Sequence, residues 1–148
     1  MNVKKTAIVP QSAESMFKLI NSVDQYPEFL PWCGGSRILE SSSDSMTAEI
    51  TISFKGIRQS FTTQNDLSKP GEKAIGIIRL NLVKGPFRSL HGAWEIVPLG
   101  PNGCKIDFGL DYQFSNSLLE RALSPVFKQI AETFVDSFVK RADEVYVQ

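Results

Sequence analysis

The segment from Cys104 to Phe114 alternates strictly between apolar and polar side chains. Its apolar members are Cys104, Ile106, Phe108, Leu110, Tyr112 and Phe114, and Lys105, Asp107, Gly109, Asp111 and Gln113 lie between them. Successive side chains of an extended strand point to opposite faces, so this pattern predicts one dry face and one wet face. Such sheets are typically antiparallel, and another part of the chain must cover the dry face.

Other segments of the chain also carry strand patterns. The predicted strands are Val3–Val9, Met46–Lys55, Ile57–Leu67, Glu72–Val83, Phe87–Leu99 and Cys104–Phe114. The alternation is less clean in Ile57–Leu67, and the apolar run Ile75–Leu82 does not indicate which side chains face the core. Ser41–Ser45 is predicted to be a turn between two strands, and Gly100–Gly103 is a second predicted turn.

The C-terminal stretch from Ser117 to Val145 is the only segment long enough to cover the dry face. Its apolar stripe consists of Leu119, Leu123, Phe127, Ile130, Ala131, Phe134, Phe138 and Val145. Ser117 and Glu120 match a capping box, while Pro125 predicts a kink or a start just after Ser124. A one-sided sheet and one long amphipathic helix predict a single α+β domain over residues 1–148.

A shorter helix is predicted after Ser12, whose side chain can cap it. Four apolar residues follow at helical spacing, namely Met16, Phe17, Ile20 and Val23. The next segment, Tyr26–Cys33, is rich in aromatic residues and contains two prolines. Because those prolines forbid a long regular helix, we expect a short helix and a loop there.

Charge and composition bear on which partners the protein has. Sixteen basic residues balance sixteen acidic ones, which argues against a general nucleic-acid binder, and no DNA partner is expected, but a local basic patch stays open. No apolar run reaches the roughly 20 residues of a membrane span, and Met1–Pro10 lacks a signal-peptide pattern. We therefore expect a bacterial cytoplasmic protein with reduced, partly buried Cys33 and Cys104, although sequence alone leaves a disulfide open.

Candidate catalytic groups are few. His91 is the only histidine, and by parity it lies on the strand face opposite Trp94, so it should point outward. Neither a nucleophile with an adjacent base nor a metal-ligand spacing is evident in the sequence. Glu49 and Asp107 fall on wet faces, where carboxylates are usually solvated. We expect a binding protein that needs no cofactor for catalysis.

Eight aromatic side chains should point into the space between sheet and helix. They are Phe54, Phe61, Trp94, Phe108, Tyr112, Phe127, Phe134 and Phe138. They form either a packed core or the lining of an apolar cavity that holds a hydrophobic ligand. Composition does not decide between these two interpretations.

Three blocks of sequence resemble the coenzyme Q-binding, START-like (polyketide cyclase/dehydrase) family. They are Tyr26–Cys33 with Ser36–Glu40, which looks like a YPxFxPxC signature; Asn81–Phe87 with Leu90–Trp94 and Pro98–Leu99; and Ala122–Phe127 running to Phe138–Ala142. The blocks occur in the family's order and cover essentially the whole chain. Within the family, the chain looks most like the bacterial branch of ribosome association toxins.

The resemblance implies a helix-grip fold, in which a curved antiparallel sheet wraps around the long C-terminal helix. It implies a non-enzymatic protein that binds ubiquinone or a related polyprenyl lipid and supports cellular respiration. The toxin branch, named as part of a toxin–antitoxin pair, instead implies binding to the large ribosomal subunit and a block of subunit association. A third alternative is a polyketide cyclase-like enzyme, whose activity would depend on His91 or Asp107.

The resemblance also implies where a hydrophobic ligand would bind. Tyr26–Trp32 would lie near the cavity mouth, and the Leu82–Phe87 loop would form a second rim. The predicted ligand-binding residues are Tyr26, Pro27, Phe29, Leu30, Trp32, Phe54, Phe61, Leu82, Phe87, Trp94, Phe108, Phe127, Ala131, Phe134 and Phe138. The alternative for Tyr26–Trp32 is a rigid turn that positions the first helices.

Ribosome binding would require a basic patch, because RNA phosphates are anionic. Candidates are Lys4, Lys5, Lys55, Arg58, Lys84, Arg88, Lys105, Lys140 and Arg141. The alternative is that these are ordinary solvated surface residues. No transmembrane segment is predicted, and peripheral contact with a membrane stays open.

Overall fold

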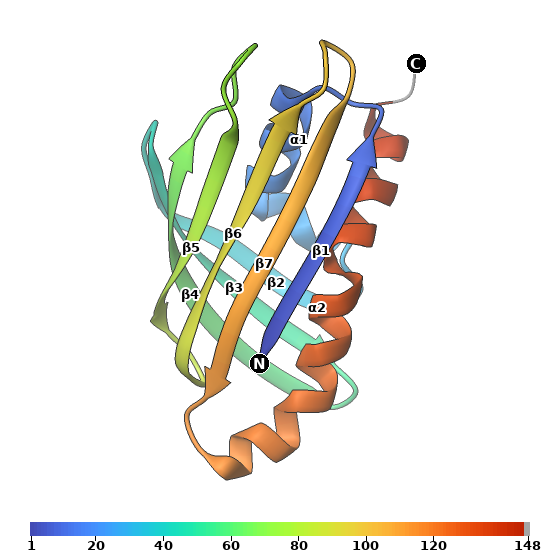
Figure 1. Ribbon diagram of the computed structural model, residues 1–148. Helices are drawn as coiled ribbons and strands as arrows, with labels where there is room; N and C mark the ends of the chain where they lie inside the picture. Colours follow the sequence, from blue (N-terminus) through green and yellow to red (C-terminus); the bar gives the residue numbers. More distant parts are fainter. Residues whose placement is uncertain (147–148) are drawn as a thin grey trace.

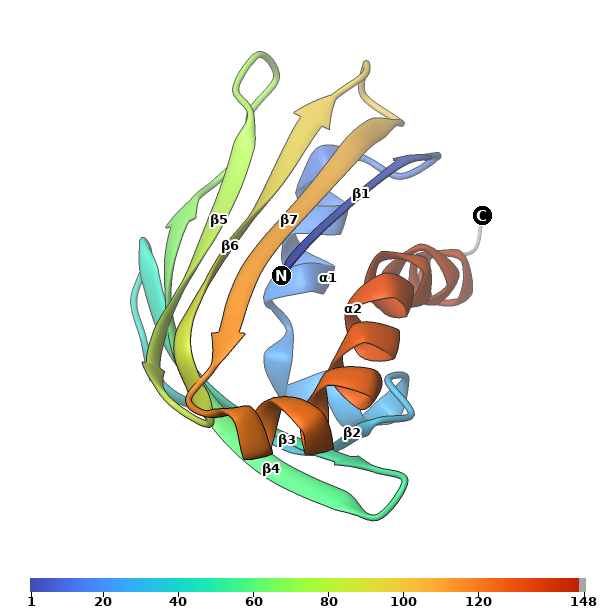
Figure 2. The same cartoon turned by 60° about the horizontal axis from the view of Figure 1, so that its bottom comes forward.

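The computed structural model describes residues 1–146, which form one curved antiparallel sheet with helices on its concave side (Figure 1). The strands are β1 (Asn2–Val9), β2 (Cys33–Ser41), β3 (Ser45–Phe54), β4 (Ile57–Ser68), β5 (Gly76–Lys84), β6 (Phe87–Pro98) and β7 (Cys104–Phe114). The helices are α1 (Ala13–Asn21), the 3-10 helix η1 (Val23–Glu28) and α2 (Ser117–Val145). Figure 2 shows the sheet curving around α2, so the predicted helix-grip, START-like architecture is confirmed.

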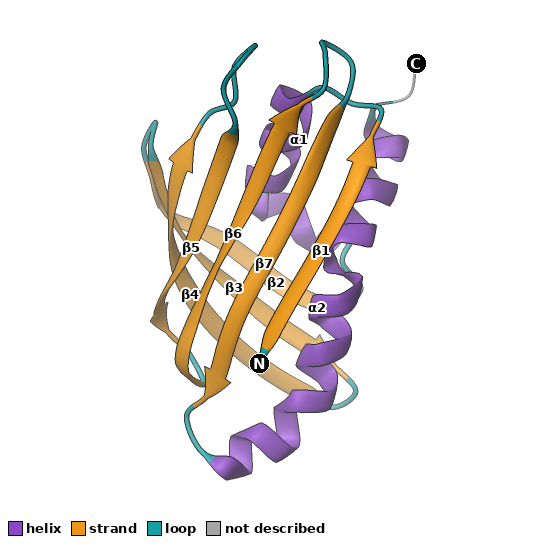
Figure 3. Ribbon diagram, in the orientation of Figure 1, coloured by secondary structure: helices purple, strands orange, loops and turns teal. Residues whose placement is uncertain are grey.

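The strand order is β1-β7-β6-β5-β4-β3-β2, and every neighbouring pair is antiparallel. Strands β2 to β7 follow one another as hairpins, whereas β1 pairs with β7 at the far edge. Helices α1 and η1 therefore connect the two edge strands β1 and β2. In Figure 3 these helices and α2 lie on the same side of the sheet.

The strand registers place the predicted apolar faces together. Trp94 of β6 pairs with Phe108 of β7 and with Ile78 of β5, and all three side chains are buried. In the β3–β4 hairpin, Lys55 and Gly56 both have positive φ angles, of 51° and 81°. Two such residues make the tight turn whose twist suits a hairpin. Because Trp94, Phe108 and Ile78 are buried between the sheet and the helices, the dry face predicted from alternation is the concave face.

The N-cap of helix α2 is Asn116, one residue before the predicted cap, Ser117. The side chain of Asn116, whose φ is −156°, accepts a hydrogen bond from the backbone N–H of Leu119 at 2.9 Å. Ser117 is already helical, so the predicted Ser117–Glu120 capping box is wrong. The cap needs an extended backbone, and Asn116 supplies it.

Pro125 lies inside helix α2, so a helix start just after Ser124 is also wrong. The proline removes one backbone donor and crowds the carbonyl one turn earlier, which bends a helix without ending it. In Figure 2 the first turns of α2 run at an angle to the rest, as expected for the predicted kink.

Other element boundaries differ from the sequence prediction. Strand β5 begins at Gly76 instead of Glu72, because Gly71 and Ala74 exchange backbone hydrogen bonds in a turn before it. Ser12 caps α1 as predicted, but the helix ends at Asn21 and Val23 belongs to η1. The two prolines of the following segment do limit it to one short helix and a loop.

The two cysteines are free, buried thiols. Burial raises the pKa of the Cys33 thiol, and it raises the pKa of Cys104 to about 11. The Sγ of Cys33 also donates to the carbonyl of Gly35 at 3.3 Å. The alternative of a disulfide is therefore wrong, and both side chains behave as small apolar core residues.

Candidate functional site

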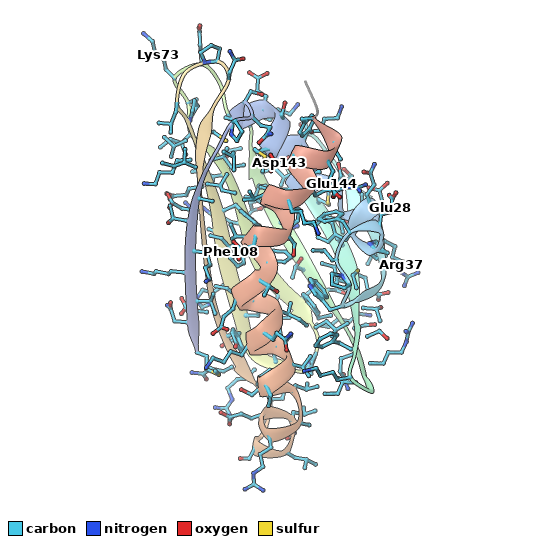
Figure 4. The ribbon with its side chains drawn as sticks, turned by 90° about the vertical axis from the view of Figure 1, so that its right-hand side faces the viewer. Glu28, Arg37, Lys73, Phe108, Asp143 and Glu144 are labelled. Atoms are coloured by element: carbon cyan, nitrogen blue, oxygen red, sulfur yellow. The ribbon has the colours of Figure 1, made fainter. Side chains whose placement is uncertain are left out.

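The concave side of the sheet encloses an apolar cavity of about 80 Å³. Its walls come from α1 and η1, from strands β3 to β7 and from α2. The cavity therefore lies where the sheet and the long helix face each other. Figure 4 shows Phe108, one of its wall residues, on the sheet beside α2.

Eight of the predicted ligand-binding residues line this cavity. They are Tyr26, Trp32, Phe61, Trp94, Phe108, Phe127, Ala131 and Phe134. The sheet contributes Phe61, Trp94 and Phe108, and the remaining members come from α2 and from the proline-aromatic segment. Residues far apart in the sequence thus meet on one internal surface.

The other seven predicted residues lie outside the cavity lining. They are Pro27, Phe29, Leu30, Phe54, Leu82, Phe87 and Phe138. Leu30 and Phe138 are fully buried in the core, whereas Pro27 is exposed. Phe87 packs at 5.1 Å against the stacked ring of Phe114, nearer the start of α2. The predicted Leu82–Phe87 rim loop is therefore wrong: Leu82 belongs to β5 and Phe87 to β6, only Gly85 and Pro86 lie between the strands, and Phe87 packs in the core beside the cavity.

Sequence reasoning missed twelve residues of the lining. They are Ile20, Asn21, Val23, Ile50, Ile52, Thr63, Asn65, Ile78, Leu80, Leu90, Leu110 and Ile130. Six of them are aliphatic strand residues, and strand parity could have found the four that lie outside the Ile75–Leu82 run, namely Ile50, Ile52, Leu90 and Leu110. Thr63 and Asn65 are polar, and apolar periodicity carries no signal for them.

Phe134 of α2 is the centre of the aromatic contacts around the cavity. Its ring centroid lies 5.3 Å from that of Phe108, 5.6 Å from Trp94 and 6.0 Å from Trp32. Phe134 itself is only partly buried. Rotation of Phe134 would therefore enlarge the cavity.

The size of the cavity limits what it can hold in this state. Sites for drug-sized ligands usually have about 300–1,000 Å³, and an engineered apolar cavity of about 150 Å³ binds benzene. The space of about 80 Å³ is smaller than either. In the described conformation the space is therefore too small for such a ligand, whose entry requires side chains such as Phe134 or Phe61 to move.

The cavity is lined by neutral side chains. Tyr26 is its one titratable member, and its hydroxyl donates to the backbone carbonyl of Ile20 at 2.5 Å. Burial raises the pKa of Tyr26, with a smaller contribution from Cys33, so the phenol stays protonated. Thr63 donates to Oδ1 of Asn65 at 2.8 Å. Two buried N–H groups, Nδ2 of Asn21 and Nε1 of Trp32, have no hydrogen-bond partner.

The polar residues considered for catalysis lie on the outer face of the sheet. His91 is exposed, and its Nε2 lies 3.9 Å from a carboxylate oxygen of Asp111. Asp107 accepts a hydrogen bond from Thr6 at 2.6 Å, and Glu49 accepts one from Arg37 at 3.0 Å. None of these side chains lines the cavity. Within residues 1–146, no cluster of His, Cys, Asp or Glu is arranged to hold a metal ion, and no helix is long and apolar enough to span a bilayer.

Four of the nine candidate basic residues gather at one end of the fold. Lys55 and Arg58 flank the β3–β4 turn, and Lys84 and Arg88 flank the β5–β6 turn. Both turns lie beside the start of α2, at the lower end of Figure 1. Lys55 reaches Gln129 of α2 at 3.4 Å, and Pro86 accepts a backbone hydrogen bond from Ser115.

This end of the fold, residues 54–58, 84–88 and 115–129, is strongly cationic. It carries six basic side chains and one acidic side chain, Glu120, in a chain with no net charge. Its two further basic residues are Arg121 and Lys128 of α2, and all six basic side chains are exposed. At the C-terminal end of α2, Asp143 and Glu144 (Figure 4) balance Lys140 and Arg141. The remaining candidates are scattered, and Lys105 and Arg141 lie near acidic groups.

A curved antiparallel sheet that encloses an apolar cavity against one long helix defines the START-like class of proteins. A START superfamily protein from Mycobacterium smegmatis has the same fold, with a TM-score of 0.75, 21% identity and coverage of 97% of this chain and 98% of that one. The Zhui aromatase/cyclase from Streptomyces sp. R1128 matches with a TM-score of 0.78, 15% identity and coverage of 97% and 93%. At these identities the likeness concerns the fold alone.

Sequence comparison assigns the chain to a family more specifically than the fold does. Residues 9–139 match the family described as polyketide cyclase / dehydrase and lipid transport, and the chain belongs to that family. The ribosome association toxin RatA of Escherichia coli K12 is 47% identical over 97% of this chain and 88% of its own length. The mitochondrial coenzyme Q-binding protein COQ10 homolog B of Xenopus laevis is 24% identical over 91% of this chain and 55% of its own. The family resemblance read from the three sequence blocks is thus confirmed.

Proposed function

We propose that this protein acts in the cytoplasm as a ribosome association factor, binding the large ribosomal subunit and hindering its joining to the small one. The observation that carries this proposal is the 47% identity to a ribosome association toxin along nearly the whole chain. A second relative with the same name, from Pseudomonas aeruginosa, is 41% identical over 98% of the chain.

The cationic end of the fold supports this proposal. Six exposed basic side chains on two turns and one helix can approach the phosphates of folded RNA together. Binding through phosphates releases counterions, so affinity falls steeply with salt. If all six made contacts, raising salt from 50 to 200 mM would weaken binding by roughly 10³-fold.

The test is a salt series of binding to purified large subunits with matched charge reversals. Lys84→Glu with Arg88→Glu changes the cationic end, whereas Lys69→Glu with Lys73→Glu makes the same charge change in the β4–β5 loop. Figure 4 shows Lys73 at the end of the molecule away from the start of α2. We expect about tenfold or greater loss of affinity and a shallower salt dependence for the first pair only. Equal loss for both pairs, or none, would refute the proposed surface.

We further propose that the internal cavity binds an apolar molecule of the polyprenyl quinone class. The cavity walls are almost entirely aliphatic and aromatic, and burial of apolar area contributes about 25 cal/mol per Å². The similarity to a protein named as coenzyme Q-binding favours a quinone over other apolar molecules. The cavity would enlarge through movement of Phe134 and Phe61, the partly buried rings of its lining.

Organic extraction of the purified protein, followed by mass spectrometry, tests this second proposal. We expect a quinone in the extract, or binding of added ubiquinone with a short tail, and loss of binding in Phe134→Trp. The larger ring of that variant would fill the space beside Trp94 and Phe108. Empty extracts together with no binding of added quinone would refute the ligand proposal and leave the ribosome proposal standing.

A further inference from the structure

The wall of the apolar cavity contains one buried polar pair, Thr63 and Asn65 of β4. Both side chains are about 95% buried, and they are two of the four buried polar residues in the described chain. Their strand neighbours are apolar, since Thr63 pairs with Ala48 and Leu82, and Asn65 pairs with Met46 and Leu80. A polar pair among such neighbours costs stability unless all its hydrogen bonds are made.

Asparagine 65 does not use its full hydrogen-bonding capacity within the protein. Its Oδ1 accepts the Thr63 hydroxyl at 2.8 Å, which fixes the orientation of the carboxamide. The hydrogen bonds of the described chain include none donated by its Nδ2. Asparagine is also a poor strand former, so neither packing nor propensity explains this residue at an inward position.

Two other polar side chains around the cavity also have hydrogen-bond donors that no protein group accepts. Nδ2 of Asn21 and Nε1 of Trp32 are buried donors without a partner, whereas the Tyr26 hydroxyl is already occupied. The unused capacity of the wall therefore consists mainly of N–H donors. No lysine, arginine, histidine, aspartate or glutamate is among the described lining residues. This set matches an uncharged acceptor, because an anion would lack a cationic partner.

We infer that Asn65, held by Thr63, is a specificity-determining residue that donates a hydrogen bond to a carbonyl oxygen of a neutral, otherwise apolar ligand. This inference rests on the proposal that the cavity binds an apolar molecule, and it adds the chemical group that the cavity recognises. Asn21 and Trp32 supply further donors to the same class of ligand when the cavity opens.

Two small probes of matched shape test the inference, acetophenone with a carbonyl and ethylbenzene without one. Dissociation constants are measured for the wild type, for Asn65→Leu and for Thr62→Val. Thr62 is the matched control, since it is equally buried on the same strand but does not line the cavity. We expect Asn65→Leu to weaken the binding of acetophenone relative to that of ethylbenzene by about 3- to 10-fold, as for the loss of one hydrogen bond. Thr62→Val should leave the ratio of the two dissociation constants unchanged.

A second measurement does not depend on the folding of a variant. The side-chain amide protons of Asn65 in the ¹⁵N-labelled wild type should shift further downfield with acetophenone than with ethylbenzene, because the two phenyl rings contribute similar shifts and only the carbonyl accepts a hydrogen bond. If both probes bind and the affinity ratio and these resonances do not distinguish them, the inference is wrong while the apolar cavity stands. If neither probe nor a short-tailed quinone binds, the cavity proposal itself fails, and the inference fails with it.

Discussion

A substitution on helix α2 that fills the cavity should separate the role of the cavity in ligand binding from its effect on stability. Ala131 is buried and lines the cavity, so leucine at this position would project three further carbon atoms into it. Ala122 lies on the same helix but is exposed, and Ala122→Leu is therefore the matched control.

The size of the expected effect follows from the cavity volume. Void space in a core costs about 24 cal/mol per Å³, so complete filling of about 80 Å³ would stabilise the fold by about 2 kcal/mol. Imperfect fit opposes this gain, because added carbons also force neighbours from their preferred rotamers. We expect Ala131→Leu to raise stability by about 1 kcal/mol, which raises Tm by roughly 2–4 °C for a domain of this size.

The assay combines thermal unfolding with titration of ethylbenzene and short-tailed ubiquinone. Ala131→Leu should lose binding of both while its Tm stays at or above that of the wild type, and Ala122→Leu should match the wild type in both measurements. A fall in stability of more than about 1 kcal/mol would mean that no void exists beside Ala131. Unchanged ligand binding in a stable Ala131→Leu protein would show that the ligand does not enter this cavity.

Three further predictions concern single side chains. Phe134→Ala should lower the free energy of unfolding by about 2–3 kcal/mol, which is less than for a fully buried phenylalanine. It should also tighten ethylbenzene binding, because the cavity approaches the size that holds benzene, and calorimetry measures both effects. Asn116→Ala should lower the free energy of unfolding in urea by about 1 kcal/mol, whereas Ser117→Ala should change it by less than about 0.5 kcal/mol. Burial raises the pKa of Cys104 from 9.0 to about 11, so the unfolded thiol ionises first and the free energy of unfolding should fall between pH 9 and 11. Urea titrations across that range should show a smaller fall for Cys104→Ala, and an equal fall would contradict the assignment.

The fold was predictable where packing follows strand or helix periodicity. The Cys104–Phe114 alternation and the stripe on α2 both describe side chains that bury against each other, so apolar residues mark them directly. Local hydrogen bonds were less predictable. Asn116 and Ser117 are both good capping residues, and only the extended backbone at Asn116 distinguishes them.

The candidate site was predictable only in its aromatic part. Large rings such as Trp94 and Phe134 lie on the dry face, and any cavity there must touch some of them. The less regular pattern of Ile57–Leu67 had a physical cause, since Thr63 and Asn65 occupy inward positions that an ordinary core would give to aliphatic residues. In an analysis of apolar periodicity, such polar residues only interrupt the pattern, although they are the polar groups that the cavity wall provides.

The gathering of cationic side chains could not be read from the sequence. Lys55, Lys84 and Arg121 belong to three separate segments, and a neutral chain gives no overall sign of a patch. Only the strand order brings the β3–β4 and β5–β6 turns to the same end as the start of α2. Tertiary topology therefore carries the information that charge composition lacks.

The most direct test of the central claim is a subunit-joining experiment. Purified small and large ribosomal subunits are mixed with the protein at low salt and separated on a sucrose gradient. We predict that the protein sediments with the large subunit and that the peak of joined ribosomes falls as its concentration rises. If the protein stays at the top of the gradient and the joined peak is unchanged, the proposed ribosome association is wrong.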